Sequence, residues 1–339
     1  IINPTINCNF SCWYCYEHHF AHSKMSEKIM NVVKRHIKNK IDEGNLRRLS
    51  LSFFGGEPLL YFEEIVAPLL QDIKETCDKK GIVLNIDFTT NGVLLTEKVI
   101  DELRKYSSVS FQITLDGDEL RHNEIRKTKN NEPTYKTIIK HIIQSVYADF
   151  NILVRLNYTK RNADTFVNII KHFRNISEEK KKNITFSFHK VWQEDPDPET
   201  EGTINDARNW FQKEGLRINR PMIESKGRCY ADKQNHIVIN YNGDLYKCTA
   251  VNFLRENREG VLSNDGNTIW NKRYTQRMSI KYKNKICKKC ILFPICHGGC
   301  TQDALIYNKD GCLRNYSKEE KEEILYRRVI ELLKTMKTY

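Results

Sequence analysis

Three cysteines close to the amino terminus restrict what this chain can fold around. Cys8, Cys12 and Cys15 lie within a stretch of eight residues. Three thiolates at this spacing can hold three irons of a cubane iron–sulfur cluster and leave the fourth iron without a protein ligand. An iron with an open coordination position can bind a small molecule and pass it an electron, which sites with four cysteine ligands are not built to do. The spacing therefore predicts a cluster with a reactive iron.

This spacing resembles the CxxxCxxC signature of the radical SAM family. In that family S-adenosylmethionine (SAM) binds the fourth iron, and one-electron reduction cleaves it to methionine and a 5′-deoxyadenosyl radical. The segment Gly55-Gly56-Glu57 follows the second predicted strand and is similar to the family's GGE motif, which implies that Gly55, Gly56 and Glu57 bind the amino group of the methionine moiety. Thr90-Asn91-Gly92, after the third strand, looks like the TNG segment. The alternative for both segments is a turn that ends a strand.

Four further residues match positions that contact SAM in the family. Thr114 stands where the SLDG pattern has serine, which implies a contact with the ribose or carboxylate of SAM. Arg126, twelve positions later, matches the arginine that pairs with the methionine carboxylate, for which a planar guanidinium is suited. Tyr14 matches an aromatic position near the adenine, and Asn157 ends the fifth predicted strand at a polar contact position. The alternative for Thr114 and Arg126 is a structural polar role.

A second group of cysteines occupies the last third of the chain. Seven cysteines follow one another there, with Gly243 five residues before the second of them: Cys229, Cys248, Cys287, Cys290, Cys296, Cys300 and Cys312. Their order and spacing resemble the SPASM domain, which carries two auxiliary four-iron clusters. The alternative is structural zinc, because four of these thiolates would suit a tetrahedral site. Seven thiols are more than one zinc ion can use, which favours clusters.

The SPASM resemblance assigns these cysteines to two sites in an interleaved order. Auxiliary cluster I would be bound by Cys229, Cys248 and Cys300, and auxiliary cluster II by Cys287, Cys290, Cys296 and Cys312. Cluster I is then one ligand short, which a substrate group, a water molecule or another side chain can fill. Together with the first motif, the resemblance implies three 4Fe-4S clusters and SAM as cofactors. Cys77, the remaining cysteine, lies on the apolar face of a predicted helix and is expected to be buried.

The first part of the chain alternates between strand-like and helix-like patterns. Apolar or β-branched runs predict strands at 1–6, 49–54, 82–89, 109–115, 151–157 and 183–188. Between them, apolar residues recur every three or four positions and predict amphipathic helices, as at 29–41, 69–77 and 138–146. Six strand–helix units predict an α/β fold, a partial (β/α)6 TIM-like barrel with its helices outside. Chemistry in such barrels lies at the carboxyl ends of the strands.

Changes in composition predict the domain boundaries. We expect the barrel at 1–192 and a connector at 193–227, where Asp195-Pro196-Asp197-Pro198 disfavours both helix and strand. A small cysteine-rich SPASM domain is expected at 228–316, with a β-hairpin that turns at Asn242-Gly243. The helical spacing of apolar residues after 316 predicts a C-terminal helix at 317–339.

Composition and charge narrow the setting in which the chain works. Hydrophobic residues make up 40% of the 339 residues, no apolar run is long enough to span a bilayer, and no signal-peptide pattern opens the sequence. We therefore expect a cytoplasmic protein without a membrane partner, whose clustered thiols bind metal rather than form disulfides. The net charge of +12 comes from scattered Lys and Arg. Their scatter favours a solvated surface over a nucleic-acid groove, and the positive charge suits anionic clusters and an acidic peptide.

The two resemblances together imply an enzyme that acts on a peptide. SPASM enzymes mostly modify peptides and proteins, so we expect a maturase that forms a thioether or carbon–carbon crosslink in a ribosomally made precursor peptide, with a flavodoxin or ferredoxin as electron donor. One alternative is an anaerobic sulfatase-maturating enzyme, which makes formylglycine. In that branch an aspartate, proposed as the base, follows the second SPASM cysteine, whereas Thr249 follows Cys248 here. A non-enzymatic iron–sulfur or zinc scaffold is an alternative of another class. The sequence does not assign a general base.

Overall fold

The computed structural model describes residues 1–44, 46–219, 229–307, 312 and 314–336. The residues group into two compact units, and the members of each unit lie closer to one another in space than to the other unit. The first unit contains Ile1–Pro221 and Val238–Ile269, and the second contains Met222–Ile237 and Trp270–Tyr339. The three-cysteine loop and Cys248 therefore belong to the first unit, and the six other cysteines of the second group belong to the second.

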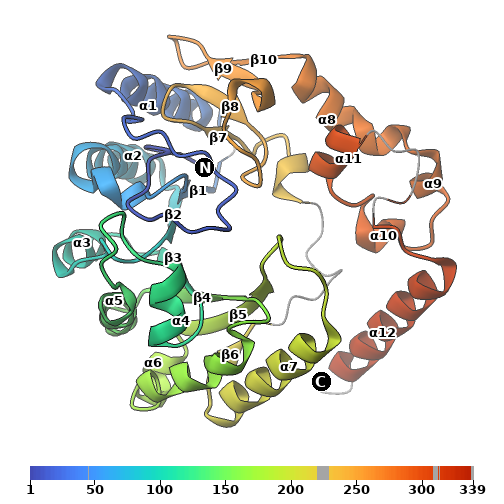
Figure 1. The fold of residues 1–339 in the computed structure, drawn as a ribbon. Coiled ribbons are helices and arrows are strands. Elements are labelled where there is room, and N and C mark those ends of the chain that lie inside the picture. The colour runs from blue at the N-terminus through green and yellow to red at the C-terminus, as the bar shows by residue number, and fades with distance from the viewer. Residues whose placement is uncertain (45, 220–228, 308–311, 313, 337–339) are drawn as a thin grey trace. The chain divides into compact units, whose positions relative to one another are not determined.

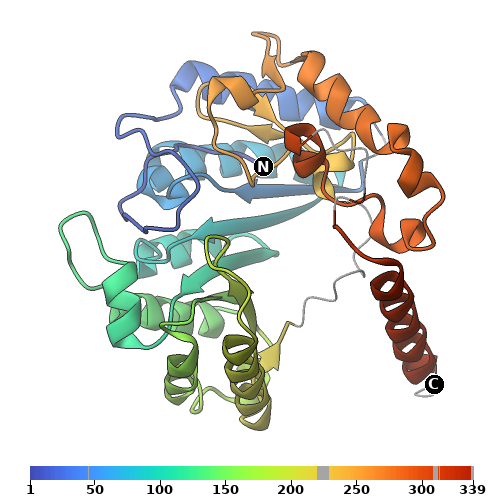
Figure 2. The ribbon, with the colours of Figure 1, turned by 45° about the vertical axis from the view of Figure 1, so that its right-hand side comes forward.

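A parallel sheet of six strands forms the centre of the first unit (Figure 1). Its strands lie side by side in chain order: β1 (Arg48–Phe53), β2 (Val83–Thr90), β3 (Val109–Leu115), β4 (Asn151–Tyr158), β5 (Ile184–Lys190) and β6 (Arg217–Ile218). Helices alternate with the strands and lie outside the curved sheet (Figure 2): α1 (Glu27–Asp42), α2 (Ala67–Lys80), α3 (Glu97–Leu103), α4 (Glu119–Ile125), α5 (Tyr135–Tyr147), α6 (Glu178–Lys181) and α7 (Pro198–Lys213). Shorter helical turns are η1 (Pro58–Tyr61), η2 (Phe62–Val66) and η3 (Ala163–His172). This arrangement confirms the predicted α/β partial barrel.

The sheet gains its sixth strand at the opposite end from the one we predicted. The expected strand at 1–6 joins this sheet through an isolated bridge from Ile2 to Phe53 of β1, whereas β6 was not predicted. β6 is only two residues long, too short to give a periodic pattern. Ile2 pairs on both sides, because it also bridges to Ile239, which is distant in the sequence.

Phenylalanines in register form part of the core. Phe53, Phe88 and Phe111 lie opposite one another on β1, β2 and β3, and their rings stack with centroid distances of 5.0 and 5.2 Å. All three side chains are fully buried, which stabilises the fold by roughly 1.5–3 kcal/mol each. The predicted apolar face of the first helix is confirmed, since α1 buries Val32, Ile37 and their neighbours behind the cap that Ser26 provides. Cys77 is buried on α2, as expected.

The predicted hairpin forms, and it packs with the first unit. β7 (Val238–Ile239) pairs antiparallel with β8 (Asp244–Tyr246) across the turn at Gly243, whose φ of +84° suits glycine. With β9 (Gly260–Leu262) and β10 (Thr268–Trp270) they make a four-stranded sheet in the order β10-β9-β8-β7. The short 3-10 turn η5 (Arg255–Asn257) lies between β8 and β9. We placed this hairpin in the cysteine-rich domain, but its backbone is hydrogen-bonded to residues 1 and 3 instead.

The segment 193–227, expected as a connector, contains α7 and β6. Pro198 occupies the first turn of α7, where a missing backbone N–H costs nothing, and the Asp197 side chain accepts a hydrogen bond from the Thr200 N–H. The Asp-Pro run that we interpreted as a breaker therefore starts a helix. Both elements belong to the first unit; the remaining domain boundaries stay a prediction.

The second unit is built mainly from helices. These are α8 (Lys272–Lys283), α9 (Lys285–Lys288), α10 (Phe293–Cys296), α11 (Thr301–Tyr307) and α12 (Lys318–Met336), with the turn η4 (Tyr230–Asp232). α8 packs against α11, and α12 matches the predicted C-terminal helix. Turns and loops between the short helices carry most of the cysteines of this unit.

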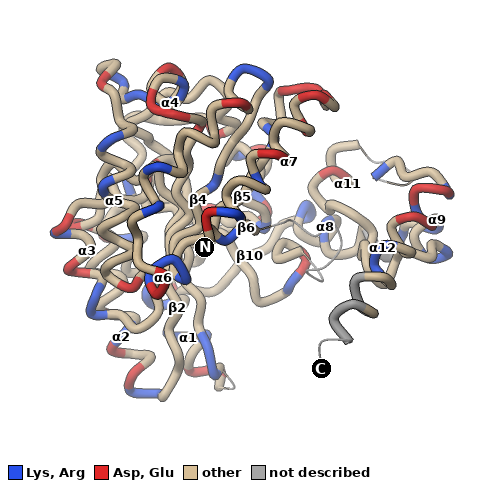
Figure 3. The backbone as a smooth tube through the Cα atoms, turned by 90° about the horizontal axis from the view of Figure 1, so that it is seen from below, with Lys and Arg blue, Asp and Glu red and all other residues tan. Residues whose placement is uncertain are grey.

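Charged residues are distributed along the helices of each unit. Figure 3 shows Lys and Arg close to Asp and Glu in α2, α3 and α6, rather than gathered on one element. Ion pairs such as Lys74–Asp78 and Arg104–Asp101 connect them. Within the described residues, no helix has both the length and the apolar character needed to cross a bilayer.

Candidate functional site

The loop before α1 carries the first three cysteines. Cys8 is buried, Cys12 is half-buried and Cys15 is exposed. The backbone N–H of Phe10 lies 3.4 Å from Cys8 Sγ and donates to it, and the Cys15 N–H donates to the Cys12 carbonyl over 3.1 Å. Our sequence reasoning missed His19, whose Nε2 lies 3.3 Å from Cys15 Sγ. Its position four residues after a predicted ligand was the available signal.

The hydroxyl of Tyr14 joins this loop to the carboxyl ends of the strands. It donates to Asp116 Oδ2 over 2.6 Å and accepts from Arg126 Nη1 at 2.8 Å and Asn157 Nδ2 at 3.2 Å. The structure thus brings Tyr14, Arg126 and Asn157 together, as the predicted SAM contacts require. Arg155 Nε donates to Asn157 Oδ1 over 2.8 Å and completes the group.

Asp116 is the member of this group that sequence reasoning missed. It directly follows β3, inside the motif that we matched for Thr114 alone. The carboxylate is fully buried, and burial raises its pKa to about 6 against the opposing charge of Arg126 and the hydrogen bond from Tyr14. Thr114 itself is buried at the end of β3, in register with Arg155 of β4.

Two buried atoms of this group have no partner among the described residues. They are Asp116 Oδ1 and Arg126 Nε. Buried polar atoms are nearly always hydrogen-bonded in a complete structure, so a bound polar ligand would account for both. An Arg guanidinium is suited to a carboxylate, and an aspartate oxygen to a hydroxyl or ammonium group. The residues present therefore fit a zwitterionic ligand such as SAM.

Glu57 lies buried behind the three-cysteine loop. Its Oε1 accepts from the Leu59 N–H at 3.0 Å and from Thr90 Oγ1 at 2.7 Å, and its Oε2 accepts from the Asn91 N–H at 2.7 Å. A carboxylate offers about four acceptor positions, so about one stays open on Oε2. The side chain of Asn91 donates to Asn9 Oδ1 over 2.7 Å, which links the third-strand motif to the loop. A contact between Glu57 and an amino group stays a prediction.

The glycine pair makes room for the backbone of the cysteine loop. A Cβ atom at Gly56 would lie 2.1 Å from the Asn7 carbonyl oxygen, and one at Gly55 would lie 2.7 Å from the Asn3 side chain. The Gly56 N–H donates to Glu17 Oε2 over 2.8 Å, and burial raises the pKa of Glu17 to about 7. The structure accounts for both glycines by this close approach, and their contact with a methionine moiety stays a prediction.

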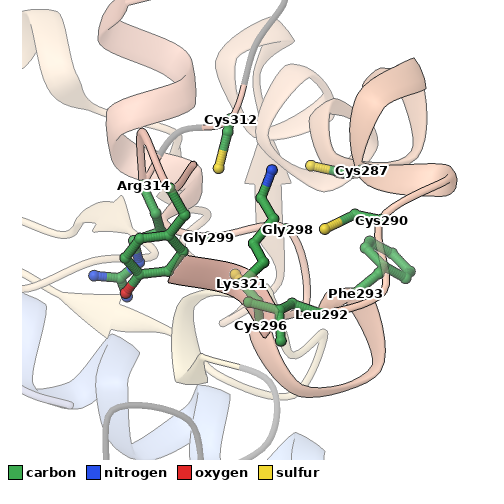
Figure 4. A pocket seen from close by; sticks show the side chains of 11 residues that line it. Cys287, Cys290, Leu292, Phe293, Cys296, Gly298, Gly299, Cys312, Arg314 and Lys321 are labelled. Atoms are coloured by element: carbon green, nitrogen blue, oxygen red, sulfur yellow. The ribbon is translucent and has the colours of Figure 1, made fainter. Parts of the chain in front are cut away.

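Four cysteines of the second unit surround one pocket. Cys287, Cys290, Cys296 and Cys312 line it, together with Arg314 and Lys321. Figure 4 shows the sulfurs of Cys287, Cys290 and Cys312 facing the space between them, with the Lys321 side chain extending into it. In the part of the chain that is described, no three Cys, His, Asp or Glu side chains converge on a single-ion position. A thiolate donor set flanked by two cations fits an anionic iron–sulfur cluster.

The three cysteines predicted for auxiliary cluster I are divided between the two units. Cys248 belongs to the first unit, where the Ala250 N–H donates to its Sγ at 3.3 Å. Cys229 and Cys300 belong to the second unit, where they lie near each other: burial raises the pKa of Cys300, and the neighbouring Cys229 adds to that rise. A shared site for all three stays a prediction.

Comparison with known proteins identifies a family model that matches this chain and solved structures that share its fold. The family model described as the Radical SAM superfamily matches residues 2–176, which is more than half of the chain. The structure of native anSMEcpe with bound AdoMet has the same fold, with a TM-score of 0.73, 19% identity, and coverage of 99% of this chain and 98% of that chain. The structure of Streptococcus suis SuiB bound to S-adenosylmethionine is similar with a TM-score of 0.61 and 17% identity, over 92% of this chain and 74% of that chain.

Among curated relatives, the radical SAM cyclopropyl synthase TigE of Paramaledivibacter caminithermalis is 31% identical over 154 residues. That match covers 40% of this chain, and the chain spans only 30% of the length of TigE. The three-cysteine loop, the strand-end residues and the cysteine-lined pocket lie on a fold shared with anSMEcpe and SuiB. The chain belongs to the Radical SAM superfamily and has the fold of its SPASM enzymes.

Proposed function

We propose that this radical SAM enzyme is a cytoplasmic maturase that forms a thioether or carbon–carbon crosslink in a ribosomally made precursor peptide. Two similarities support a peptide substrate. The anSMEcpe fold is known with a Kp18Cys peptide bound, and the SuiB fold with the precursor peptide SuiA bound. The observation that carries the enzymatic part is the pair of unpartnered buried atoms, Asp116 Oδ1 and Arg126 Nε, beside a tyrosine of the three-cysteine loop.

The residues of the first unit would divide the work as follows. Cys8, Cys12 and Cys15 would hold a 4Fe-4S cluster, and Arg126 would hold the carboxylate of SAM. The Tyr14 hydroxyl accepts from the Arg126 guanidinium and from Asn157, and so would fix the guanidinium. When bound, cluster and SAM supply a 5′-deoxyadenosyl radical that can remove a hydrogen atom from an unactivated carbon. Burial of Asp116 and Arg126 keeps water away from this position and strengthens their hold on a charged ligand.

The cysteines of the second group would hold two further clusters. Cys287, Cys290, Cys296 and Cys312 would bind one through the pocket that they line, with Arg314 and Lys321 offsetting its negative charge. Cys229, Cys248 and Cys300 would bind the other. A crosslink between two substrate atoms removes two hydrogens from the peptide, so one electron and one proton remain after the first hydrogen atom is taken. The auxiliary clusters would accept that electron and a base or solvent the proton, and a flavodoxin or ferredoxin would supply the reductant for SAM.

An anaerobic sulfatase-maturating activity is the second candidate. The full-length likeness to anSMEcpe favours it, since that fold covers 99% of this chain. The residue after Cys248 disfavours it: Thr249, whose carbonyl accepts from the Tyr16 hydroxyl at 3.1 Å, stands where that branch has an aspartate. Threonine has no carboxylate and therefore cannot replace the aspartate as a base. A non-enzymatic scaffold is ruled out by membership of the Radical SAM superfamily.

Formation of 5′-deoxyadenosine tests the enzymatic part directly. The chain is reconstituted anaerobically with iron and sulfide, then mixed with SAM and dithionite. Wild type and the Cys77→Ala control, which alters a buried packing residue of α2, should form 5′-deoxyadenosine, and Cys12→Ala should not. If wild type forms none, or if Cys12→Ala forms as much as wild type, the proposed site is wrong.

Mass spectrometry of a peptide substrate separates the two candidates. The first substrate to try is a short Cys- or Gly-rich peptide encoded beside the gene. A crosslink leaves the peptide two hydrogens lighter and produces no carbonyl, whereas formylglycine reacts with a hydrazide probe. Metal analysis distinguishes iron–sulfur clusters from structural zinc, because three four-iron clusters would give about twelve irons per chain.

A further inference from the structure

Among the described residues of the second unit, Arg277 is the largest side chain that is almost completely buried. It lies on α8, is 2% exposed, and donates Nη1 to Thr301 Oγ1 over 3.1 Å and Nη2 to Gln302 Oε1. Burying a guanidinium is costly, and the cost is offset only where its N–H groups find acceptors. Both acceptors belong to the first turn of α11, directly after Cys300.

The same hydroxyl continues the network toward Cys229. Thr301 Oγ1 accepts from Arg277 and donates to Asp232 Oδ1 over 2.9 Å. Asp232 is buried, and its backbone N–H donates to the Cys229 carbonyl over 3.0 Å. A chain of buried hydrogen bonds therefore connects the residue after Cys300 with the turn that begins at Cys229.

Cys300 directly precedes the first turn of α11. Burial raises the pKa of the Cys300 thiol, and the backbone N–H groups of Asp303 and Gln302 in this turn oppose that rise. Hydrogen bonds to the sulfurs of an iron–sulfur cluster help to set its reduction potential. They stabilise the reduced cluster, which carries more negative charge, so weaker hydrogen bonds lower the potential.

We infer that Arg277 is a positioning residue for the cluster bound by Cys229 and Cys300. It fixes Thr301 and Gln302 in the turn that follows Cys300, and through Thr301 and Asp232 it fixes the turn that begins at Cys229. This inference rests on the proposed ligand assignment of auxiliary cluster I. It goes beyond that assignment because Arg277 is no ligand and lies outside every motif that the sequence offered. Its role is to hold this turn, through hydrogen bonds to two neutral acceptors.

The test compares reduction potentials of reconstituted variants. Arg277→Gln removes the two-armed donor, Arg277→Lys retains one cationic donor, and Lys272→Gln removes the same charge from the exposed start of α8. Cluster signals are followed by electron paramagnetic resonance during an anaerobic redox titration, and the signal that Cys300→Ala abolishes identifies auxiliary cluster I. We expect Arg277→Gln to retain the iron of wild type while this signal shifts to more negative potential. Arg277→Lys should shift less, and Lys272→Gln should match wild type.

Three other results would overturn the inference. An Arg277→Gln protein with full iron content and an unchanged potential overturns the inference. Should that variant fail to fold, Thr301→Val removes only the shared hydroxyl, and the same negative shift is expected there; its absence overturns the inference as well. If Cys300→Ala holds as much iron and shows the same signals as wild type, the ligand assignment itself fails and takes the inference with it.

Discussion

The Tyr14 hydroxyl lies 2.6 Å from Asp116 Oδ2 and donates a hydrogen bond to it. Tyr14 stands between two cysteines of the first motif, and Asp116 follows β3, so this bond fixes the cysteine loop to the sheet. The Asp116 side chain is fully buried, so it has no water with which to replace the tyrosine hydroxyl.

Tyr14→Phe should destabilise the first unit. The variant leaves Asp116 and Arg126 buried with one partner fewer each, which costs about 1–3 kcal/mol of free energy of unfolding. Urea unfolding of the chain measures it. Trp13→Phe is the control, because Trp13 lies in the same loop with 54% of its surface exposed and should change the free energy by less than about 0.5 kcal/mol. Equal midpoints for Tyr14→Phe and wild type would contradict the role of the hydroxyl.

Gly56→Ala should displace the cysteine loop. Gly56 has a φ of +47°, and a Cβ there would lie 2.1 Å from the Asn7 carbonyl oxygen. Gly81→Ala is the matched control, since Gly81 has a φ of +66° and no atom within 4 Å of the added Cβ. The control should cost only the left-handed strain of about 1–2 kcal/mol. Gly56→Ala should cost more and also lower the iron bound per chain; a loss no larger than that of Gly81→Ala would show that the loop has room to move.

Arg126→Lys should weaken SAM binding. A guanidinium can hold a carboxylate through two parallel hydrogen bonds, whereas an ammonium offers a point charge. We expect Kd for SAM to rise by about tenfold or more, equivalent to about 1.4 kcal/mol. Equilibrium dialysis on the reconstituted protein measures it. Arg121→Lys, on the exposed side of α4 and paired with Glu124, should bind like wild type, and similar affinities for both variants would remove Arg126 from the site.

Cys290→Ala should lower the iron content. Cys290 lines the pocket with three other cysteines, so its loss removes a ligand of auxiliary cluster II, and we expect up to about four of about twelve irons to be lost. Cys77→Ala, the buried cysteine of α2, should keep all of them. The iron content of each variant, determined after anaerobic reconstitution, tests this prediction. Zinc bound in place of iron in wild type would instead support a structural metal site.

His189 should make stability depend on pH. Burial, with Arg155 and Arg208 adding to it, lowers the pKa of His189 to about 4, whereas an unfolded histidine titrates near about 6.5. Between these values the unfolded chain binds more protons, so stability is present above the unfolded pKa and falls as pH falls. From about pH 7 to about pH 5, wild type should lose about 2 kcal/mol relative to His189→Gln. Urea titrations at both pH values measure the difference, and a constant difference would refute it.

Local patterns predicted the parts of the fold that depend on local sequence. The alternation of strands and helices, the cap at Ser26 and the turn at Gly243 are all encoded within a few residues. The conformation of residues 1–6 is not encoded locally, because the backbone around Ile2 is fixed by partners on β1 and β7 that lie far away in the sequence. The pair Arg217–Ile218 was missed because its strand is two residues long.

The candidate site was predictable where a motif named a residue. Tyr14, Arg126 and Asn157 were each matched singly, and the structure shows that one hydroxyl connects them. Asp116 was missed because a buried acid is recognisable only from its partners, and these come from two other segments of the chain, at Tyr14 and Arg126. Arg277 was missed for the same reason, since nothing in the sequence of α8 distinguishes it from Lys272 and Arg273, which precede it.

The two-sided pairing at the amino terminus also affects synthesis. Ile2 bonds to Ser52 and Phe54, while Ile1 and Asn3 bond to Ile239. On the ribosome, residues 1–3 leave the exit tunnel long before residue 239 is translated, so the groups that bond to Ile239 lack that partner until then. An unpaired edge of this kind invites association with other nascent chains. Slow translation before residue 239 would prolong that exposure, and rapid translation would shorten it.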